Sequence, residues 1–153
     1  MTENTPRTVL EELFRTQRFA VLATAQAGDP YASLVAFAVT PDLKGVLFVT
    51  SQLTRKYGNL RSDPRVALLI DSRANRVTDF QAAVAVTALG RASELAGEEH
   101  QAFLGVYLER HPSMREFAHA PTTSLFRVSV ERYVLVDHFQ HVVNMDVGQG
   151  PSC

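Results

Sequence analysis

Hydroxyl and cationic side chains gather between two apolar runs of this 153-residue sequence, 46–49 and 66–70. They are Thr50, Ser51, Thr54, Arg55 and Lys56. A helix that begins within 51–54 would expose unpaired backbone N–H groups and the positive end of its dipole, and both favour an anion. Arginine adds a planar donor group suited to bidentate phosphate contacts. The spacing therefore indicates a phosphate site, with a capped surface helix bearing two solvated cations as the competing interpretation.

The helix that would carry these cations is expected to be amphipathic. Leu53, Tyr57 and Leu60 recur at helical spacing and should form its apolar face. Asn59 lies three residues after Lys56 on another face of the helix. An Asp-Pro pair follows and should end the helix, because proline disfavours helix for the residue before it.

Strand-forming runs precede the candidate site. The runs 19–25 and 31–38 are separated by a turn that contains Gly28 and Pro30, and they predict a hairpin. A third strand is expected at 46–50. Three consecutive strands with short links favour an antiparallel meander over a parallel sheet with crossover helices.

The second half of the chain adds further strands and one clear helix. The segment 81–94 is the longest strand-forming run, and Gly90 within it indicates a bulge or a close backbone approach. Alternation over 124–131 predicts a half-buried strand, and one or two more strands follow from 133 to 145. Helices are expected at 5–18 and 97–110. The fold class is therefore mainly β with peripheral helices (α+β), in a small and mostly antiparallel barrel.

Size and composition limit the remaining possibilities. The length favours one domain over 1–145 and a flexible tail over 146–153. A net charge of −1 gives no global attraction to nucleic acid, so no nucleic-acid partner is expected. We expect no membrane partner because no apolar run is long enough to span a bilayer. The N-terminus lacks a secretory signal and Cys153 has no cysteine to pair with, so cytoplasmic localisation is expected.

The histidines do not predict a metal site. His138 and His141 are three residues apart in an expected strand, so they should face opposite sides. His100, His111 and His119 are expected on helix surfaces or at helix ends. Dinucleotide-binding and nucleophile-elbow motifs are also absent from the sequence, so it indicates no catalytic residue.

The order of these elements resembles the FMN-binding split-barrel family, which includes pyridoxamine 5′-phosphate oxidase and the haem-utilisation-type proteins. The resemblance is carried by the segments FAVLATAQAGDPYASLVAF and LFVTSQLTRKYGNLRSDPRVALLID, and more weakly by the long strand that ends Gly90-Arg-Ala and by VERYVLVDHF. It covers roughly 7–145 and implies a small antiparallel split β-barrel that binds FMN. Family members are typically homodimers with the flavin at the subunit interface.

The resemblance also implies roles for particular residues. The strand segment Ser33, Leu34, Val35 and Ala36 would run beside the isoalloxazine ring through main-chain and small side-chain contacts. Thr50, Ser51, Thr54, Arg55 and Lys56 would hold the ribityl 5′-phosphate, with Asn59 steadying the turn. A residue of the partner subunit, such as Phe139 or His141, could reach the ring.

Departures from the family pattern count against pyridoxamine phosphate as the substrate. The Arg-Gln pair of the oxidases is Val84-Ala85 here, Leu89 precedes Gly90, and their C-terminal Arg and His pattern has no match in 133–145. The sequence therefore favours a flavin-dependent oxidoreductase whose substrate and electron donor it does not identify. Two alternatives remain: a deazaflavin-dependent reductase, and a non-enzymatic flavin- or haem-binding module.

Overall fold

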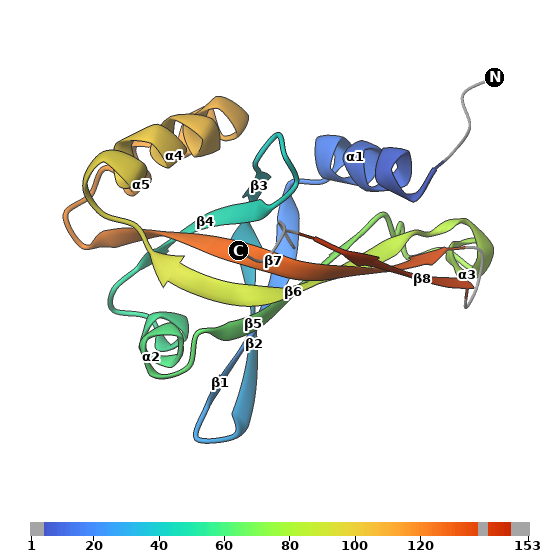
Figure 1. Cartoon of the computed structure of the whole chain (residues 1–153), viewed down its shortest axis with the longest axis horizontal. Helices are drawn as coiled ribbons and strands as arrows, with labels where there is room; N and C mark the ends of the chain where they lie inside the picture. Colours follow the sequence, from blue (N-terminus) through green and yellow to red (C-terminus); the bar gives the residue numbers. More distant parts are fainter. Residues whose placement is uncertain (1–4, 138–140, 148–153) are drawn as a thin grey trace, which may run out of the picture.

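The computed structural model describes residues 5–137 and 141–147. One eight-stranded sheet forms the centre of the fold, and the helices lie around it (Figure 1). The elements in chain order are α1 (Pro6–Thr16), β1 (Phe19–Gln26), β2 (Asp29–Ala36), β3 (Ala38–Val39), β4 (Gly45–Ser51), α2 (Arg55–Ser62), β5 (Arg65–Asp71), α3 (Asp79–Ala82), β6 (Ala85–Glu94), α4 (Gly97–Arg110), the 3-10 helix η1 (Pro112–Met114), α5 (Arg115–Ala118), β7 (Thr123–Asp137) and β8 (His141–Asp146).

The sheet is curled, because its two end strands, β2 and β3, follow each other directly in the sequence. The strand order is β2-β1-β5-β6-β7-β4-β3, with β8 paired to β7, and every pair is antiparallel. Only Phe37 separates β2 from β3, so the chain passes from one end of the sheet to the other at this residue. β3 pairs with β4 only at Val46 and Leu47. Beyond them β2 contacts β4 without pairing to it among the described strands, which leaves a split in the barrel.

This split antiparallel barrel is the predicted fold class, but its connections differ from a simple meander. The hairpin of β1 and β2 is confirmed, with Phe19 opposite Ala36 and Gln26 opposite Asp29. The prediction of one continuous strand over 31–38 is wrong. The chain breaks at the buried Phe37 into two strands, and these strands pair with different neighbours. A buried aromatic side chain at this point lets the chain turn across the end of the barrel.

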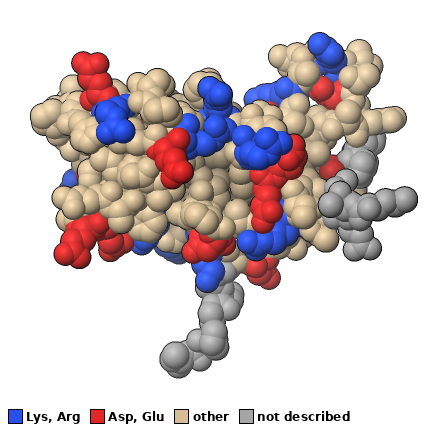
Figure 2. Space-filling view, turned by 90° about the horizontal axis from the view of Figure 1, so that it is seen from above, with Lys and Arg blue, Asp and Glu red and all other residues tan. Residues whose placement is uncertain are grey.

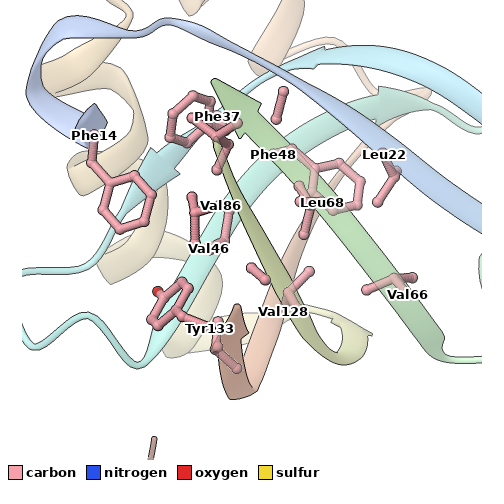
Figure 3. Packing of buried hydrophobic residues seen from close by; sticks show 14 of the residues in the cluster. Phe14, Leu22, Phe37, Val46, Phe48, Val66, Leu68, Val86, Val128 and Tyr133 are labelled. Carbon is pink, nitrogen blue, oxygen red and sulfur yellow. The ribbon is translucent and has the colours of Figure 1, made fainter. Parts of the chain in front are cut away.

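Aromatic side chains fill the barrel and close one end of it (Figure 3). The rings of Phe48 and Phe126 stack with centroids 5.5 Å apart. The ring centroid of Phe14 on α1 lies 6.1 Å from that of Phe37 and 5.6 Å from that of Tyr133. The first helix therefore covers the end of the barrel at which β2 passes into β3. Burial of such rings contributes most of the favourable free energy of folding in a domain of this size.

A β-bulge explains why β7 looked like two strands in the sequence. Gly90 pairs with Val130 and Leu89 pairs with Arg132, so Glu131 is an extra residue on β7. The phase of inward-facing residues therefore shifts at this point, and the expected strands 124–131 and 133–136 are one continuous strand. The predicted close approach at Gly90 is also confirmed, because a Cβ there would lie 2.2 Å from the carbonyl oxygen of Ser129.

The expected strand over 81–94 begins later than predicted. The short helix α3 occupies its first residues because the Oδ2 atom of Asp79 accepts the backbone N–H groups of Ala74 and Asn75, both at 2.8 Å. β6 starts only at Ala85, which makes β7 and not β6 the longest strand. A carboxylate that binds the amides of a preceding loop favours a turn over an extended strand.

The C-terminal boundaries are described in part. β8 includes Asp146, which the sequence analysis assigned to the tail, and the N–H of Val147 donates to the carbonyl oxygen of Glu131 at 2.9 Å. His138, Phe139 and the segment 148–153 lie outside the described residues. Within the described part, no helix has the length and apolar character needed to cross a bilayer. Basic and acidic residues are interspersed on the face that Figure 2 shows.

Candidate functional site

The hydroxyl groups that follow β4 shape a tight turn. Thr54 is the N-cap of α2, because its Oγ1 accepts the N–H of Tyr57 at 3.3 Å. The same Oγ1 lies 2.9 Å from Oγ1 of the buried Thr50 and 2.9 Å from the carbonyl oxygen of Ser51. The hydroxyl of Ser51 accepts the N–H of Leu53 at 3.2 Å, which leaves its proton available for donation. Thr50 and Thr54 therefore fix the turn, whereas Ser51 keeps a free donor.

The helix begins at Arg55, one residue after the range 51–54 expected from the sequence, with Thr54 as its N-cap. Leu53 lies before it with 88% of its surface exposed, so the prediction that Leu53 shares the apolar face with Tyr57 and Leu60 is wrong. Tyr57 and Leu60 do pack toward the core. The N-cap at Thr54 ends the preceding turn and takes Leu53 out of the helical register.

Arg55 and Lys56 place two cations in the first turn of α2 without a counter-ion. Neither forms an ion pair with any residue of 5–137 or 141–147, and the first turn holds no acidic residue. Lys56 is half-buried, and its burial lowers the pKa of the ammonium group. The guanidinium of Arg55 lies over the ring of Tyr31, 4.7 Å from its centroid. Together with the helix dipole, these charges make a locally positive site at the end of the barrel.

Asn59 connects α2 to the barrel. It is buried, and its Nδ2 donates to Oγ1 of Thr24 on β1 at 3.0 Å, whereas its Oδ1 has no partner among the described residues. Its amide is therefore bonded to a strand and not to the turn that the sequence analysis assigned to it. Thr24 is the cross-strand partner of Tyr31, so Asn59 and Arg55 both anchor α2 to the same β1–β2 pair.

The segment Ser33–Ala36 lies on an edge strand beside the split. Ser33 and Val35 point inward, and Leu34 on the opposite face is 68% exposed. The edge of β2 away from β1 carries no strand among the described residues, so its N–H and C=O groups have no ladder partner on that side. The carbonyl oxygen of Ala36 is taken by the hydroxyl of Tyr107. The Oγ atom of Ser33 is buried without a hydrogen-bond partner in the described part of the chain. An orphaned hydroxyl next to an unpaired strand edge fits a polar ring edge placed there.

One contact links the two groups of expected site residues, because Arg55 lies over Tyr31, two residues before Ser33 on β2. Arg55 reaches the start of β2 through Tyr31, and β2 contacts β4, which leads into Thr50 and Ser51. The sequence does not predict a role for Tyr31, because no local spacing links a strand residue to a cation on a later helix. A polar network behind the turn was not predicted either. In that network Tyr57 donates to Glu94 at 3.0 Å, Ser124 donates to Glu94 at 2.6 Å, and Gln52 donates to Ser124 at 2.9 Å.

One histidine lies at a helix end, as expected, but is buried. His111 caps the C-terminus of α4, and its Nε2 lies 2.6 Å from the carbonyl oxygen of Phe37. Burial is the main cause that lowers the pKa of its imidazole. The hydroxyl of Tyr107 donates to the carbonyl oxygen of Ala36 at 3.3 Å, so α4 fixes the end of β2 through two contacts. No three metal-ligating side chains come together among the described residues.

The outer face of the sheet next to β2 is apolar and exposed. One row of cross-strand partners runs from β2 to β7 through Leu34, Val21, Leu69, Thr87 and Val134. Phe19 on the same face of β1 is 63% exposed, Leu34 68% and Leu69 36%. Contiguous apolar exposure of this kind marks an interaction surface more often than a surface facing water.

Comparison with known proteins is consistent with this architecture. The family model described as pyridoxamine 5′-phosphate oxidase matches residues 7–137. The fold is similar to that of a haem-binding protein from Mycobacterium smegmatis, with a TM-score of 0.83, 20% identity and coverage of 95% of this chain and 60% of that chain. An FAD-binding protein from Mesorhizobium loti gives a TM-score of 0.70 at 20% identity, with coverage of 86% and 92%.

A third solved structure, the haem storage protein HutZ from Vibrio cholerae, gives a TM-score of 0.70 at 21% identity and coverage of 84% of this chain and 92% of that chain. No curated protein matches the sequence. The chain spans 60% of the Mycobacterium smegmatis protein and 61% of the similar Agrobacterium tumefaciens protein Atu2129. The match of the family model over most of the chain shows that this protein belongs to the pyridoxamine 5′-phosphate oxidase family.

Proposed function

We propose that this protein binds FMN and acts as a flavin-dependent oxidoreductase. The observation that carries the proposal is the pair of cations at the start of α2, Arg55 and Lys56, which have no counter-ion in the described part of the chain, with Arg55 lying over Tyr31 of β2. An uncompensated half-buried ammonium group lowers the stability of the free protein, and a phosphate would remove that cost by pairing with it. Family membership supports a phosphate-bearing cofactor at this position.

Each group of residues has a defined task in this proposal. Arg55, Lys56 and the hydroxyl of Ser51 bind the phosphate, while Thr50 and Thr54 hold the turn in shape. The main chain of Ser33–Ala36 and the free hydroxyl of Ser33 donate to or accept from the polar edge of the ring. Bound flavin supplies the electron chemistry, and the chain's own contribution is to orient the ring and exclude water from one face.

The proposal also includes a homodimer. A second copy would cover the apolar outer face that holds Phe19, Leu34 and Leu69, and this face continues from the strand proposed to lie beside the ring. Light scattering coupled to gel filtration should give twice the chain mass. Leu34→Glu should shift the protein toward monomer, whereas Leu53→Glu, at a more exposed leucine outside this row, should not. A wild-type monomer at all concentrations would contradict the dimer.

Direct binding tests the cofactor. The purified protein should show flavin absorbance or should quench FMN fluorescence on titration, with a dissociation constant in the micromolar range or below. Parallel titration with a deazaflavin distinguishes a deazaflavin-dependent reductase. Reduction of the bound FMN by NADH or NADPH separates an oxidoreductase from a non-enzymatic flavin carrier. Absence of any binding would overturn the proposal.

Haem is the second ligand to test, and one pair of side chains favours it. Nδ1 of His141 lies 2.7 Å from Oδ1 of Asp137, an arrangement that orients a histidine for metal ligation through its other nitrogen. Two of the similar solved structures are described as haem-binding or haem storage proteins. A Soret band on haem titration that is lost in His141→Ala, with no FMN binding, would support this alternative over the flavin.

A further inference from the structure

Arg55 is held by an aromatic ring and not by a carboxylate, and Arg61 in the last turn of the same helix also lies over a ring, 5.9 Å from the centroid of Tyr57. Its guanidinium lies 4.7 Å from the centroid of Tyr31, and it forms no ion pair with a described residue. Carboxylates hold the arginines in several other places: Arg15 with Glu12 at 2.7 Å, and Arg65 with Asp63 at 2.8 Å. The position next to the N-terminus of α2 therefore has a different kind of support for its cation.

The nature of that support matters for an anion site. A carboxylate beside Arg55 would cancel its charge and would compete with a phosphate for the same N–H donors. An aromatic face restricts the guanidinium to one region by stacking and cation–π attraction while the charge and the edge donors stay available. The Tyr31 ring thus limits the positions that Arg55 samples without occupying its hydrogen-bonding capacity.

Tyr31 also belongs to the strand proposed to run beside the ring of the cofactor. Tyr31, Ser33 and Val35 lie on one face of β2, because side chains alternate along a strand. The cross-strand partner of Tyr31 is Thr24, which accepts the hydrogen bond from Asn59 of α2. Two contacts therefore fix α2 relative to the β1–β2 pair: one anchors the helix and the other anchors its cation.

We infer that Tyr31 is a positioning residue for the phosphate contact of Arg55, and that it makes the site selective for the phosphorylated form of the ligand. This inference rests on the proposed function. It assigns Tyr31 no contact with the cofactor. Its effect should appear only on a ligand that carries the phosphate, because it acts through the cation and not through the ring or the ribityl chain.

The test compares Tyr31→Phe and Tyr31→Leu with the wild-type protein in titrations with FMN and with riboflavin. Loss of an exposed cation–π contact should raise the dissociation constant for FMN by about two- to five-fold in Tyr31→Leu. Tyr31→Phe keeps the ring and should bind FMN like the wild type. Riboflavin binding should be unchanged in both variants, which also shows that they fold.

A double-mutant cycle gives the decisive comparison. In an Arg55→Ala background, Tyr31→Leu should have no further effect on FMN binding, because the cation it positions is absent. Equal weakening of FMN and riboflavin by Tyr31→Leu, or additive effects in the cycle, would overturn the inference and leave the phosphate site intact. Unchanged FMN affinity in Arg55→Ala, or no FMN binding by the wild type, would overturn the proposed function and this inference with it.

Discussion

Replacement of Lys56 by methionine should separate the phosphate from the rest of the cofactor. Methionine keeps the approximate length and the apolar stem of lysine but removes the charge. Lys56 is half-buried and has no counter-ion among the described residues, so its charge is less screened than that of a surface lysine. Riboflavin lacks the phosphate, so its dissociation constant reports the contacts to the ring and the ribityl chain without the contact between the phosphate and Lys56.

The expected size of the effect follows from the surroundings of the charge. Two unit charges 4 Å apart attract by about 1 kcal/mol in water and by about 4 kcal/mol near a protein surface. A charge-assisted hydrogen bond contributes about 1.5–3 kcal/mol. Lys56→Met should therefore raise the dissociation constant for FMN by about 10- to 100-fold. The increase caused by Arg55→Ala should lie at the lower end of this range, because Arg55 is exposed and salt screens its charge more strongly.

Fluorescence titration with FMN and riboflavin measures both effects at low and moderate salt. Arg61→Ala is the matched control, because Arg61 is an exposed cation in the last turn of the same helix and bonds to the hydroxyl of Tyr57 at 3.2 Å. Its FMN affinity should change by less than about two-fold. The reasoning is refuted when Lys56→Met weakens FMN and riboflavin equally, or when Arg61→Ala weakens FMN as strongly as Lys56→Met does.

The remaining predictions concern stability and can be measured by chemical unfolding of four variants. Lys56→Met should stabilise the ligand-free protein, because burial disfavours the charged ammonium group; a destabilised variant would contradict the cost assigned to that charge. Gly90→Ala should be strongly destabilising, by about 3 kcal/mol or more, because its Cβ would lie 2.2 Å from the carbonyl oxygen of Ser129. Gly105→Ala in α4, where a Cβ meets open space, should instead stabilise by about 0.5–1 kcal/mol. His111 has a folded-state pKa below its usual 6.5, so the unfolded chain binds more protons and the unfolding free energy should fall as the pH drops below about 6.5. His111→Gln should flatten this dependence between pH 5 and 7, and an unchanged slope would show that another group causes it.

Local patterns predicted most of the fold. Thr5 and Pro6 start α1 as expected, with the Oγ1 of Thr5 accepting the N–H of Thr8 at 3.2 Å. The β1–β2 hairpin and α4 also follow from turn residues and periodicity. The prediction from periodicity failed in β7, where Glu131 is an extra residue opposite Gly90 and shifts the alternation of inward-facing residues. This bulge depends on the pairing of β6 with β7, which the sequence of either segment alone does not indicate.

The candidate site was predictable only in its local part. The cap at Thr54 and the cations at Arg55 and Lys56 follow from residue types within one turn. The contacts that fix this turn to the barrel come from residues far away in the sequence, such as Tyr31 under Arg55 and Thr24 under Asn59. Such contacts depend on strand register and helix placement, which local spacing does not encode.

A crystal structure of the FMN complex tests the central claim most directly. The account predicts that the phosphate oxygens lie within hydrogen-bond distance of Arg55, Lys56 and the hydroxyl of Ser51, and that the ring lies along 33–36 on β2. A phosphate bound elsewhere, with Lys56 still unpaired at the start of α2, would contradict it.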